Sequence, residues 1–309
     1  MLGRKIKKLK NWLQNRHNLQ LFRLRLAEDR QKTALYRAVL ISHELSATGA
    51  PLMLLAAAEA ILADGGSVRV LAYMDGPLRK KFEKLGIPVF YHPGFRDNAR
   101  LLNEFGGDCA YAVANTAVAY PAVSLLKGPR VLWWIHEAQV IEKDYIARFR
   151  QKKFRPDLEQ TLRQAGKLAV VSDYAREIAA KYNPRVEVIH PAVADVAKEQ
   201  GLQPKQPAEK IRFAMLGAVC EIKGQDVLLK DVRLLPAAYR AQAEFHIAGR
   251  RDGAFAEDLA AESGDLPEVV WEESRSRDNL WDFYRENDVI MVASRDESFS
   301  LVALEACMA

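Results

Sequence analysis

The sequence is poor in cysteine and lacks long apolar runs. Its three cysteines, Cys109, Cys220 and Cys307, stand far apart with no spacing typical of a zinc site, so we expect reduced, buried thiols in a cytoplasmic protein. No run approaches the roughly 18 uncharged apolar residues that a transmembrane helix requires. Because Lys and Arg interrupt every early apolar stretch, we also expect no secretory signal.

Two ligand-binding motifs are also missing. No Gly-x-Gly-x-x-Gly follows the first strand of either half, which argues against a dinucleotide-dependent oxidoreductase. No Asp-x-Asp stands at a strand end, so a metal-held diphosphate is not expected. No aromatic-interleaved basic patch recurs in the body of the chain, which argues against nucleic acid as a partner. We therefore expect neither a cofactor nor a bound metal.

Positive charge is concentrated at one end of the chain. The net charge of the chain is +5. Residues 1–37 carry a net charge of +9, and the rest of the chain carries −4. Residues 1–36 predict a basic amphipathic segment with two apolar sets. These sets are Leu2, Ile6, Leu9, Trp12 and Leu13, then Leu19, Phe22 and Leu26. Two interpretations stay open: residues 1–30 bind an anionic membrane surface, or they pack on their own domain.

Beyond this segment, short apolar runs alternate with amphipathic helical stretches. The alternation predicts a parallel sheet covered by helices on both faces, in a Rossmann-like domain over residues 37–195. The expected strands are 38–42, 68–73, 89–91, 109–114, 131–135, 168–172 and 186–189.

A polar stretch with two prolines, residues 196–210, predicts an interdomain linker. A second Rossmann-like domain is expected over residues 211–309, with strands at 212–216, 244–248, 269–271 and 289–292. Because a doubly wound sheet of this kind usually has about six strands, we expect this second domain to be incomplete.

Two glutamates, Glu297 and Glu305, stand eight positions apart near the end of the sequence. Residues 288–293 predict a buried parallel strand, so Glu297 falls in the loop after it and Glu305 about two turns into the next helix. Backbone N–H groups at a helix N-terminus suit an anionic or oxygen-rich ligand. Carboxylates on either side can accept hydrogen bonds from hydroxyls, which favours a sugar site.

This stretch resembles the E-x7-E motif of the GT-B glycosyltransferases, particularly the retaining family 4. The resemblance implies two Rossmann-like domains facing across a cleft. It also implies that Glu297 contacts the donor sugar as a catalytic residue and that Glu305 binds the nucleotide ribose. The intervening Ser298, Phe299 and Ser300 would contribute to donor binding.

Residues 217–224 resemble the family's Gly-x-x-x-x-x-Lys-Gly segment, in which the lysine reaches the donor diphosphate. Gly217 and Lys223 are the matching residues. The chemistry needs a cation there because a departing nucleoside diphosphate accumulates negative charge. The family's arginine after the first glycine is replaced by Ala218, and Arg250 and Arg251 are candidates to supply that charge.

Two segments of the first domain resemble family loops. Gly49 and Ala50 match the small pair that faces the diphosphate or acceptor, and the alternative is a tight turn with Thr48 as N-cap. His136 matches a histidine near the transferred sugar, which implies a catalytic role. Glu137 binds the acceptor or caps the next helix.

The sequence thus predicts a metal-independent, retaining glycosyltransferase with a nucleotide-sugar donor. The acceptor would be a cell-surface glycan or glycolipid precursor, and the enzyme would lie in the cytoplasm or on the inner face of the plasma membrane. Two alternatives remain: a non-catalytic nucleotide-sugar-binding scaffold, favoured by Ala218 and the incomplete second domain, and a GT-B nucleotide-sugar epimerase.

Overall fold

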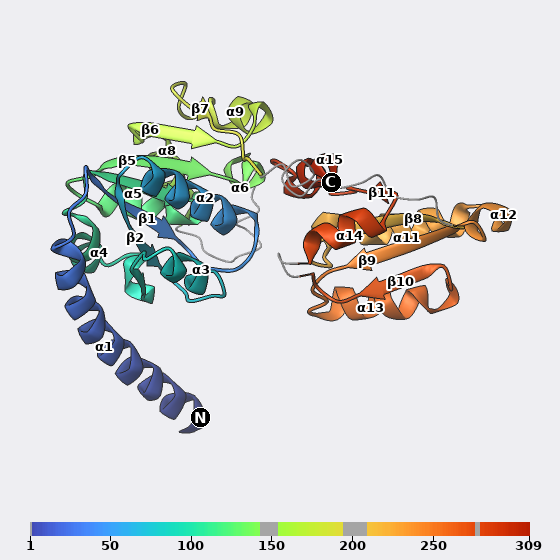
Figure 1. The fold of residues 1–309 in the computed structure, drawn as a ribbon, viewed down its shortest axis with the longest axis horizontal. Helices are drawn as coiled ribbons and strands as arrows, with labels where there is room; N and C mark the ends of the chain where they lie inside the picture. The colour runs from blue at the N-terminus through green and yellow to red at the C-terminus, as the bar shows by residue number, and fades with distance from the viewer. Residues whose placement is uncertain (1, 143–153, 194–208, 276–278) are drawn as a thin grey trace. The chain divides into compact units, whose positions relative to one another are not determined.

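The computed structural model describes residues 2–142, 154–193, 209–275 and 279–309. The chain forms two compact units, Met1–Pro191 and Ala192–Ala309, here called the first and second unit (Figure 1). Both are α/β with a parallel sheet, which confirms the expected fold class. The expected linker over 196–210 lies almost entirely outside the described residues.

All the strands expected in the first unit are present. They form one parallel sheet in the order β3-β2-β1-β4-β5-β6-β7. The direction of strand order reverses between β1 and β4, which is where ligands bind in doubly wound sheets. The strands are β1 (Arg37–Ser42), β2 (Ser67–Ala72), β3 (Val89–Tyr91), β4 (Tyr111–Asn115), β5 (Arg130–Ile135), β6 (Lys167–Val170) and β7 (Glu187–Val188).

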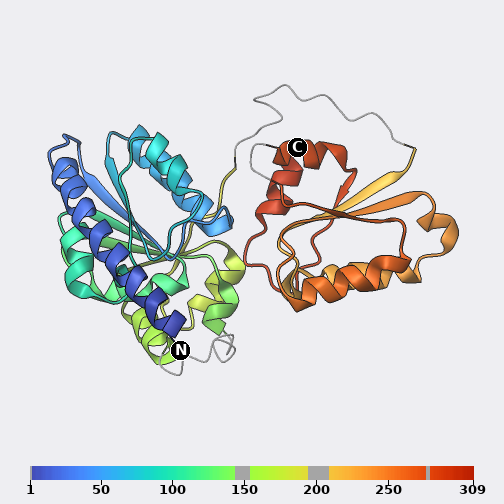
Figure 2. The ribbon, with the colours of Figure 1, turned by 90° about the horizontal axis from the view of Figure 1, so that it is seen from below.

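Helices cover both faces of this sheet (Figure 2), because its strands are apolar on both sides. In β1, Val39 and Ile41 belong to one core and Leu40 to the other. The Leu40 face is covered by α2 (Gly49–Ala63) and α3 (Arg79–Lys84). The opposite face is covered by α1 (Leu2–Arg30), α4 (Ala99–Gly106), α5 (Tyr120–Leu125), α6 (Ala138–Glu142), α8 (Phe154–Gln164) and α9 (Asp173–Ala179).

The second half of α1 packs on the first unit. Phe22 and Leu26 are buried in its core, and Leu19 packs against that core. The packing interpretation is therefore confirmed from Leu19 onward, while the side chains of residues 2–14 lie outside those described. In the described part of the chain, no helix is long and apolar enough to cross a membrane.

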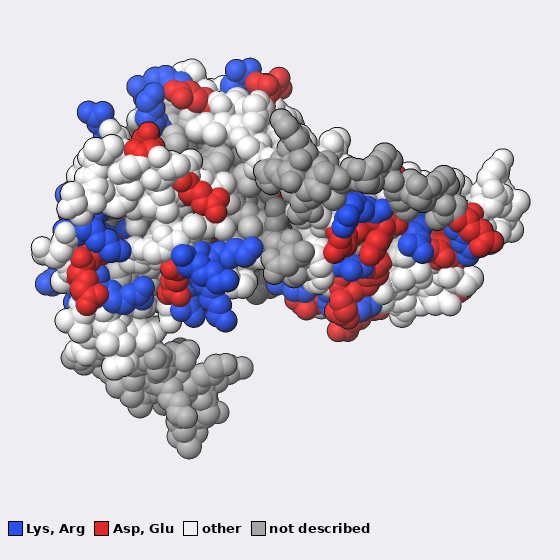
Figure 3. Space-filling view, viewed as in Figure 1, with Lys and Arg blue, Asp and Glu red and all other residues white. Residues whose placement is uncertain are grey.

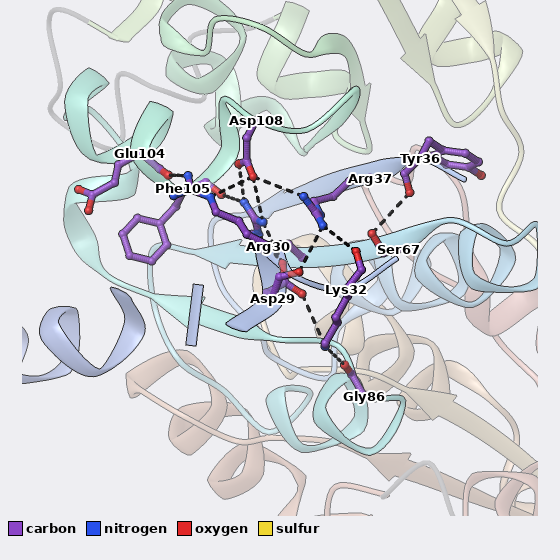
Figure 4. A network of polar contacts seen from close by, with 11 residues as sticks. Asp29, Arg30, Lys32, Tyr36, Arg37, Ser67, Gly86, Glu104, Phe105 and Asp108 are labelled. Atoms are coloured by element: carbon purple, nitrogen blue, oxygen red, sulfur yellow. Dashed lines mark hydrogen bonds and ion pairs between the residues drawn. The ribbon is translucent and has the colours of Figure 1, made fainter. Parts of the chain in front are cut away.

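A buried charge network fastens the end of α1 to the sheet (Figure 4). Arg69 in β2 is fully buried, and its guanidinium donates to Asp29 Oδ2 at 2.8 and 3.0 Å. The same guanidinium donates to Asp108 Oδ1 at 2.7 Å and to the Phe105 carbonyl at 2.5 Å. Arg30 of α1 also bonds Asp108, at 3.1 Å. The helix end and the sheet are thus joined through shared carboxylates.

Acid should loosen this attachment. The hydrogen bond from Arg23 lowers the pKa of Glu104, and hydrogen bonds from Arg69 and Arg30 lower the pKa of Asp108 although burial acts to raise it. Such carboxyls stabilise the fold above their unfolded pKa of about 4, and that stabilisation is lost as pH falls below it. We expect the melting temperature of the first unit to drop in this range, and to drop less steeply in Asp108→Asn. Equal slopes for both proteins would contradict this.

The second unit is smaller and contains the four strands expected for it. They form a parallel sheet in the order β10-β9-β8-β11. Figure 3 shows positive and negative side chains side by side on its visible face. Its elements are β8 (Ile211–Leu216), α11 (Gln225–Leu234), α12 (Ala237–Arg240), β9 (Ala243–Ala248), α13 (Ala254–Glu262), β10 (Val269–Glu272), α14 (Leu280–Glu286), β11 (Val289–Ile290) and α15 (Leu301–Met308).

The cysteines are free, as expected, but only one is buried. Cys109 lies in the core of the first unit, Cys220 is half-buried, and Cys307 is exposed on α15. The expectation of buried thiols was therefore wrong for two of the three, because Cys220 lies in the loop after β8 and Cys307 lies on α15, neither of them in the core.

Candidate functional site

The carboxyl ends of β1, β4 and β5 bring three loops together in the first unit. Asn115, the last residue of β4, is fully buried and lies at their junction. Its Nδ2 donates to the Ala50 carbonyl at 3.0 Å, and its Oδ1 lies 2.9 Å from His136 Nε2. The structure thus connects Ala50, which with Gly49 begins α2, to the predicted His136. Asn115 itself was missed, although its place at a strand end could have marked it.

Thr116, the next residue, has a strained backbone. Its φ of 78° is the only positive φ of a non-glycine residue in the described ranges, and its ψ is 162°. This region is almost restricted to glycine and costs of order 1–3 kcal/mol. Thr116 donates its N–H to the Trp134 carbonyl and accepts from Trp133 Nε1, both at 2.8 Å. Its hydroxyl lies 3.2 Å from His43 Nδ1.

Because of this strain, we expect glycine at position 116 to give a more stable protein than alanine, which is the reverse of the usual order of stability. In most ordered positions glycine is less stable than alanine, but at a positive φ alanine keeps the strain that glycine removes. We expect Thr116→Gly to be more stable than Thr116→Ala by about 1 kcal/mol. Chemical denaturation of the two variants measures the difference. A more stable alanine variant would show that this backbone conformation is not under strain.

The two histidines of this cluster are held neutral near pH 7. Burial and the neighbouring His43 lower the pKa of His136 to about 3. Burial also lowers the pKa of His43, against the opposing effect of Glu44, whose carboxylate lies 3.6 Å from His43 Nε2. These imidazoles can therefore donate and accept hydrogen bonds but do not supply positive charge.

Glu137 holds two of the loops together. Its Oε2 accepts from the backbone N–H of Ala117 at 3.0 Å and of His136 at 3.3 Å. Burial raises the pKa of Glu137, while these N–H groups act to lower it. Ala117 begins the short turn η2 (Ala117–Ala119), so Glu137 joins this turn to the end of β5. Capping of the next helix by Glu137 stays a prediction. A contact with an acceptor stays a prediction.

Thr48 and Ser172 differ in how they begin helices. Thr48 occupies the N-cap position of α2, but its side chain makes no capping hydrogen bond and instead bonds Ser46 Oγ at 2.8 Å. Ser172 caps α9 by accepting from the Ala175 N–H at 3.2 Å, as such a residue before a helix predicts.

In the second unit, Lys223 and Glu297 meet in one cavity. Lys223 Nζ lies 2.7 Å from Glu297 Oε2, which also accepts from Ser294 Oγ at 3.1 Å. Both charged side chains are about one-third exposed or less, at 34% and 27%. Ser300 lines the same cavity, and a Cβ on Gly217 would lie 4.0 Å from Lys223 Cε. Four predicted residues are therefore close together.

Two local features hold the loop of Lys223 against the loop of Glu297: a close backbone approach at Gly224 and the contacts of Arg295. Gly224 has a φ of 75°, and a Cβ there would lie 2.1 Å from the Ala293 carbonyl oxygen, so only glycine permits this approach. Arg295 binds both oxygens of Asp226, at 2.7 and 2.8 Å, and donates a further hydrogen bond to the Glu221 carbonyl. Its backbone N–H donates to the Ile222 carbonyl at 2.7 Å.

Glu305 does not line this cavity. It is 2% exposed on α15 and accepts a hydrogen bond from the Tyr284 hydroxyl at 2.8 Å. Ser300 caps the same helix by accepting from the Ala303 N–H, and Ser298 and Phe299 are half-buried in the loop before it. A role of Glu305 in binding the ribose stays a prediction.

Arg250 and Arg251, the candidates to supply the charge of the family's arginine, do not line the cavity of Lys223 and Glu297. Arg250 pairs with Asp252 at 2.9 Å. Arg251 pairs with Glu273 at 3.4 Å, and its guanidinium lies over the Trp271 ring. Lys223 is the cationic side chain that lines the cavity in the described part of the chain.

Comparison with known families matches each unit separately. Residues 36–193 match the family model described as glycosyl-transferase family 4. Residues 197–309 match the model described as glycosyl transferases group 1. Together the two matches cover nearly all of the chain outside the N-terminal segment.

The chain is similar to curated D-inositol 3-phosphate glycosyltransferases. It is 31% identical to that of Mycolicibacterium gilvum over 165 residues, which are 48% of this chain and 36% of that protein. It is 34% identical to that of Mycolicibacterium vanbaalenii over 143 residues, 40% of this chain and 31% of that protein. The match thus spans about a third of the length of these relatives.

Solved structures share the fold. Anabaena Alr3699/HepE in complex with UDP and glucose has a TM-score of 0.65 and 15% identity, covering 88% of this chain and 78% of that chain. WaaG, a glycosyltransferase involved in lipopolysaccharide biosynthesis, has a TM-score of 0.62 and 15% identity, with the same coverage. At this identity the likeness shows the GT-B fold alone.

Proposed function

The chain belongs to glycosyltransferase family 4, and we propose that it transfers a sugar from a nucleoside diphosphate sugar to a hydroxyl-bearing acceptor. The acceptor would be a cell-surface glycan or glycolipid precursor, and the reaction would retain the anomeric configuration without a metal. The observation that carries this proposal is the Lys223–Glu297 pair in a cavity near the strand ends of the second unit.

Lys223 suits the diphosphate and Glu297 suits the sugar. An ammonium group stabilises the charge that collects on a departing nucleoside diphosphate, and a carboxylate accepts hydrogen bonds from sugar hydroxyls. Before the donor binds, the two groups neutralise each other at 2.7 Å. Donor binding would then replace that ion pair with separate contacts to the phosphate and the sugar.

In the first unit, the proposed contacts are His136 with the transferred sugar, and Gly49 and Ala50 at the start of α2 with the acceptor or diphosphate. Their shared link to Asn115 supports a common site, because one buried amide orders both. The curated relatives are named for D-inositol 3-phosphate, a polyhydroxylated acceptor. For this chain we propose an acceptor of the same general chemistry, with hydroxyl groups.

Incubation with a panel of UDP-, GDP- and ADP-sugars and cell-envelope extracts tests the function. We expect release of one nucleoside diphosphate that depends on the extract. Nucleotide binding without release under any condition would favour a scaffold instead. Interconversion of the sugar without transfer would favour an epimerase.

Glu305→Ala tests the proposed ribose contact. We expect weaker binding of the donor nucleotide, provided that the variant is folded. Tyr284→Phe is the matched control, because it removes the hydrogen bond to Glu305 at 2.8 Å but keeps the carboxylate. If Glu305→Ala binds nucleotide as tightly as Tyr284→Phe and wild type, Glu305 does not bind the ribose.

We also propose that the start of α1 binds an anionic membrane surface. Deletion of residues 1–14 leaves Leu19, Phe22 and Leu26 on the core and removes five of the basic residues. We expect this variant to lose co-sedimentation with anionic liposomes, and wild type to lose it as salt rises, since surface charges are screened. Co-sedimentation equal to that of wild type would place the membrane contact elsewhere or exclude it.

A further inference from the structure

The buried amide of Asn115 has only one orientation that satisfies its neighbours. Its two hydrogen-bonding atoms face a backbone carbonyl, at Ala50, and a ring nitrogen, at His136. A carbonyl oxygen can only accept, so the NH2 group must face Ala50 and the amide oxygen must face His136. The amide oxygen in turn can only accept. His136 therefore carries a proton on Nε2.

The protonation of Nε2 decides what the other nitrogen of His136 can do. A neutral imidazole carries one proton, so a ring protonated at Nε2 has an unprotonated Nδ1 that accepts hydrogen bonds. The groups around the ring favour the neutral form. They are the buried Asn115, the aromatic ring of Trp134 at 4.7 Å and the neutral His43. Glu137 bonds the backbone N–H of His136 rather than its ring.

The backbone that carries Asn115 is fixed relative to His136. Thr116 follows Asn115 in its strained conformation and exchanges hydrogen bonds with Trp133 and Trp134 of β5, the strand that leads to His136. Strain of this kind persists only where surrounding contacts overdetermine the backbone, and such positions cluster at ligand sites. The amide and the imidazole are thus held to each other by β4–β5 pairing as well as by their own hydrogen bond.

The neighbouring Trp134, whose ring lies 4.7 Å from that of His136, also carries a buried donor. Trp134 Nε1 is buried and has no hydrogen-bond partner among the described residues. Buried donors are rarely left unpaired. A hydroxyl both donates and accepts, so it can bond an acceptor nitrogen such as an unprotonated Nδ1. An anionic oxygen only accepts, and therefore could not bond an unprotonated Nδ1.

We propose that Asn115 is a positioning residue that holds His136 in the Nε2–H tautomer, so that His136 Nδ1 accepts a hydrogen bond from a substrate hydroxyl. The tautomer follows from the contacts of Asn115 alone. The assignment of the hydroxyl to a sugar or polyol substrate rests on the proposed function. At this point of the site the substrate presents a hydroxyl and not a phosphate.

Nitrogen NMR of the imidazole rings in the full chain tests the tautomer directly. At neutral pH we expect His136 Nε2 to resonate as a protonated nitrogen and Nδ1 as an unprotonated one. In Asn115→Leu the two resonances should move toward each other as the tautomers mix. In Asn115→Asp, which keeps an acceptor oxygen, Nε2 should remain protonated. A wild-type ring protonated on Nδ1, or an unchanged tautomer in Asn115→Leu, would overturn the proposal.

Asn183→Leu is the matched control. Asn183 is also buried and donates to two backbone carbonyls, those of Leu162 and Ala165, but it bonds no histidine. We expect this variant to keep the wild-type resonances of His136 whatever it loses in stability. A tautomer change in Asn183→Leu as large as that in Asn115→Leu would mean that loosened packing, rather than the lost amide oxygen, is responsible.

Kinetics separate this proposal from the proposed function. With the donor identified by the panel, Asn115→Leu should lower kcat roughly 10- to 100-fold with little change in KM for the donor, and Asn115→Asp should recover part of the loss. Transfer at the wild-type rate by Asn115→Leu would overturn the role of His136 Nδ1. If wild type transfers no sugar, the proposed function fails, and the NMR result still decides the tautomer.

Discussion

Replacement of Arg69 by leucine is expected to lower the free energy of unfolding of the first unit by about 3–5 kcal/mol. Arg69 is fully buried and pairs with Asp29, which is 3% exposed. Without the guanidinium, the nearly buried Asp29 carboxylate keeps, among the described residues, one ion pair, with Lys32 at 3.6 Å. Breaking one half of a buried pair is costly for this reason, even where the intact pair contributes little.

Two further variants separate the ion pair from the loss of a large side chain. Arg79→Leu removes an arginine that is one-third exposed and pairs with Asp75, so it should cost less than about 1 kcal/mol. Asp29→Leu/Arg69→Leu removes both charges and should be more stable than Arg69→Leu alone. Hydrogen exchange of β1 and β2 amides reports on this unit by itself. A double variant less stable than Arg69→Leu would show that the pair is not the cause.

Replacement of Lys223 by methionine is expected to lower the rate of sugar transfer by about 10²- to 10³-fold. Methionine has a similar length and loses the charge that would meet the departing diphosphate. The Gly224 approach and the Arg295–Asp226 pair hold the loop independently of Lys223, so the cavity should persist. The loss should therefore appear in kcat as well as in donor affinity.

Lys230→Met is the matched control for this experiment. Lys230 lies on α11 of the same unit, is 72% exposed and pairs with Asp226 at 3.5 Å. Lys230→Met removes the same charge from a residue that does not line the cavity. A loss of transfer in Lys230→Met equal to that in Lys223→Met would mean that net charge, rather than the position of Lys223, matters.

The order of strands and the placement of most motifs follow from the sequence. Each apolar run expected as a strand is part of one of the two sheets. A strand that is buried on both faces has Val, Ile, Leu or Ala at most consecutive positions, and this pattern can be recognised in the sequence. Lys223 and Glu297 were each expected to follow a strand of the second domain. They meet because β8 and β11 are adjacent in the sheet.

Contacts between charges far apart in the sequence could not be predicted in this way. Asp29 and Arg69 are separated by 40 residues, and nothing local marks either as buried. The sequence left open whether residues 1–30 bind a membrane or pack on their own domain, and the packing of Phe22 and Leu26 decides this for the second half of α1.

Asn115 and Thr116 were missed for a different reason. Asn-Thr after a strand is common in loops, and the positive φ of Thr116 depends on hydrogen bonds to β5 that no short sequence pattern encodes. The buried place of Glu305 likewise depends on Tyr284 of α14, a helix that the glutamate spacing does not involve.

Titration calorimetry with the free nucleoside diphosphate tests the shared role of Lys223 and Glu297 most directly. Because Glu297 Oε2 lies 2.7 Å from Lys223 Nζ, it competes with a phosphate for the same cation. We expect Lys223→Met to bind the diphosphate more weakly than wild type and Glu297→Gln to bind it more tightly, although Glu297→Gln should transfer no sugar. Equal affinity in wild type and both variants would show that this cavity does not hold the donor.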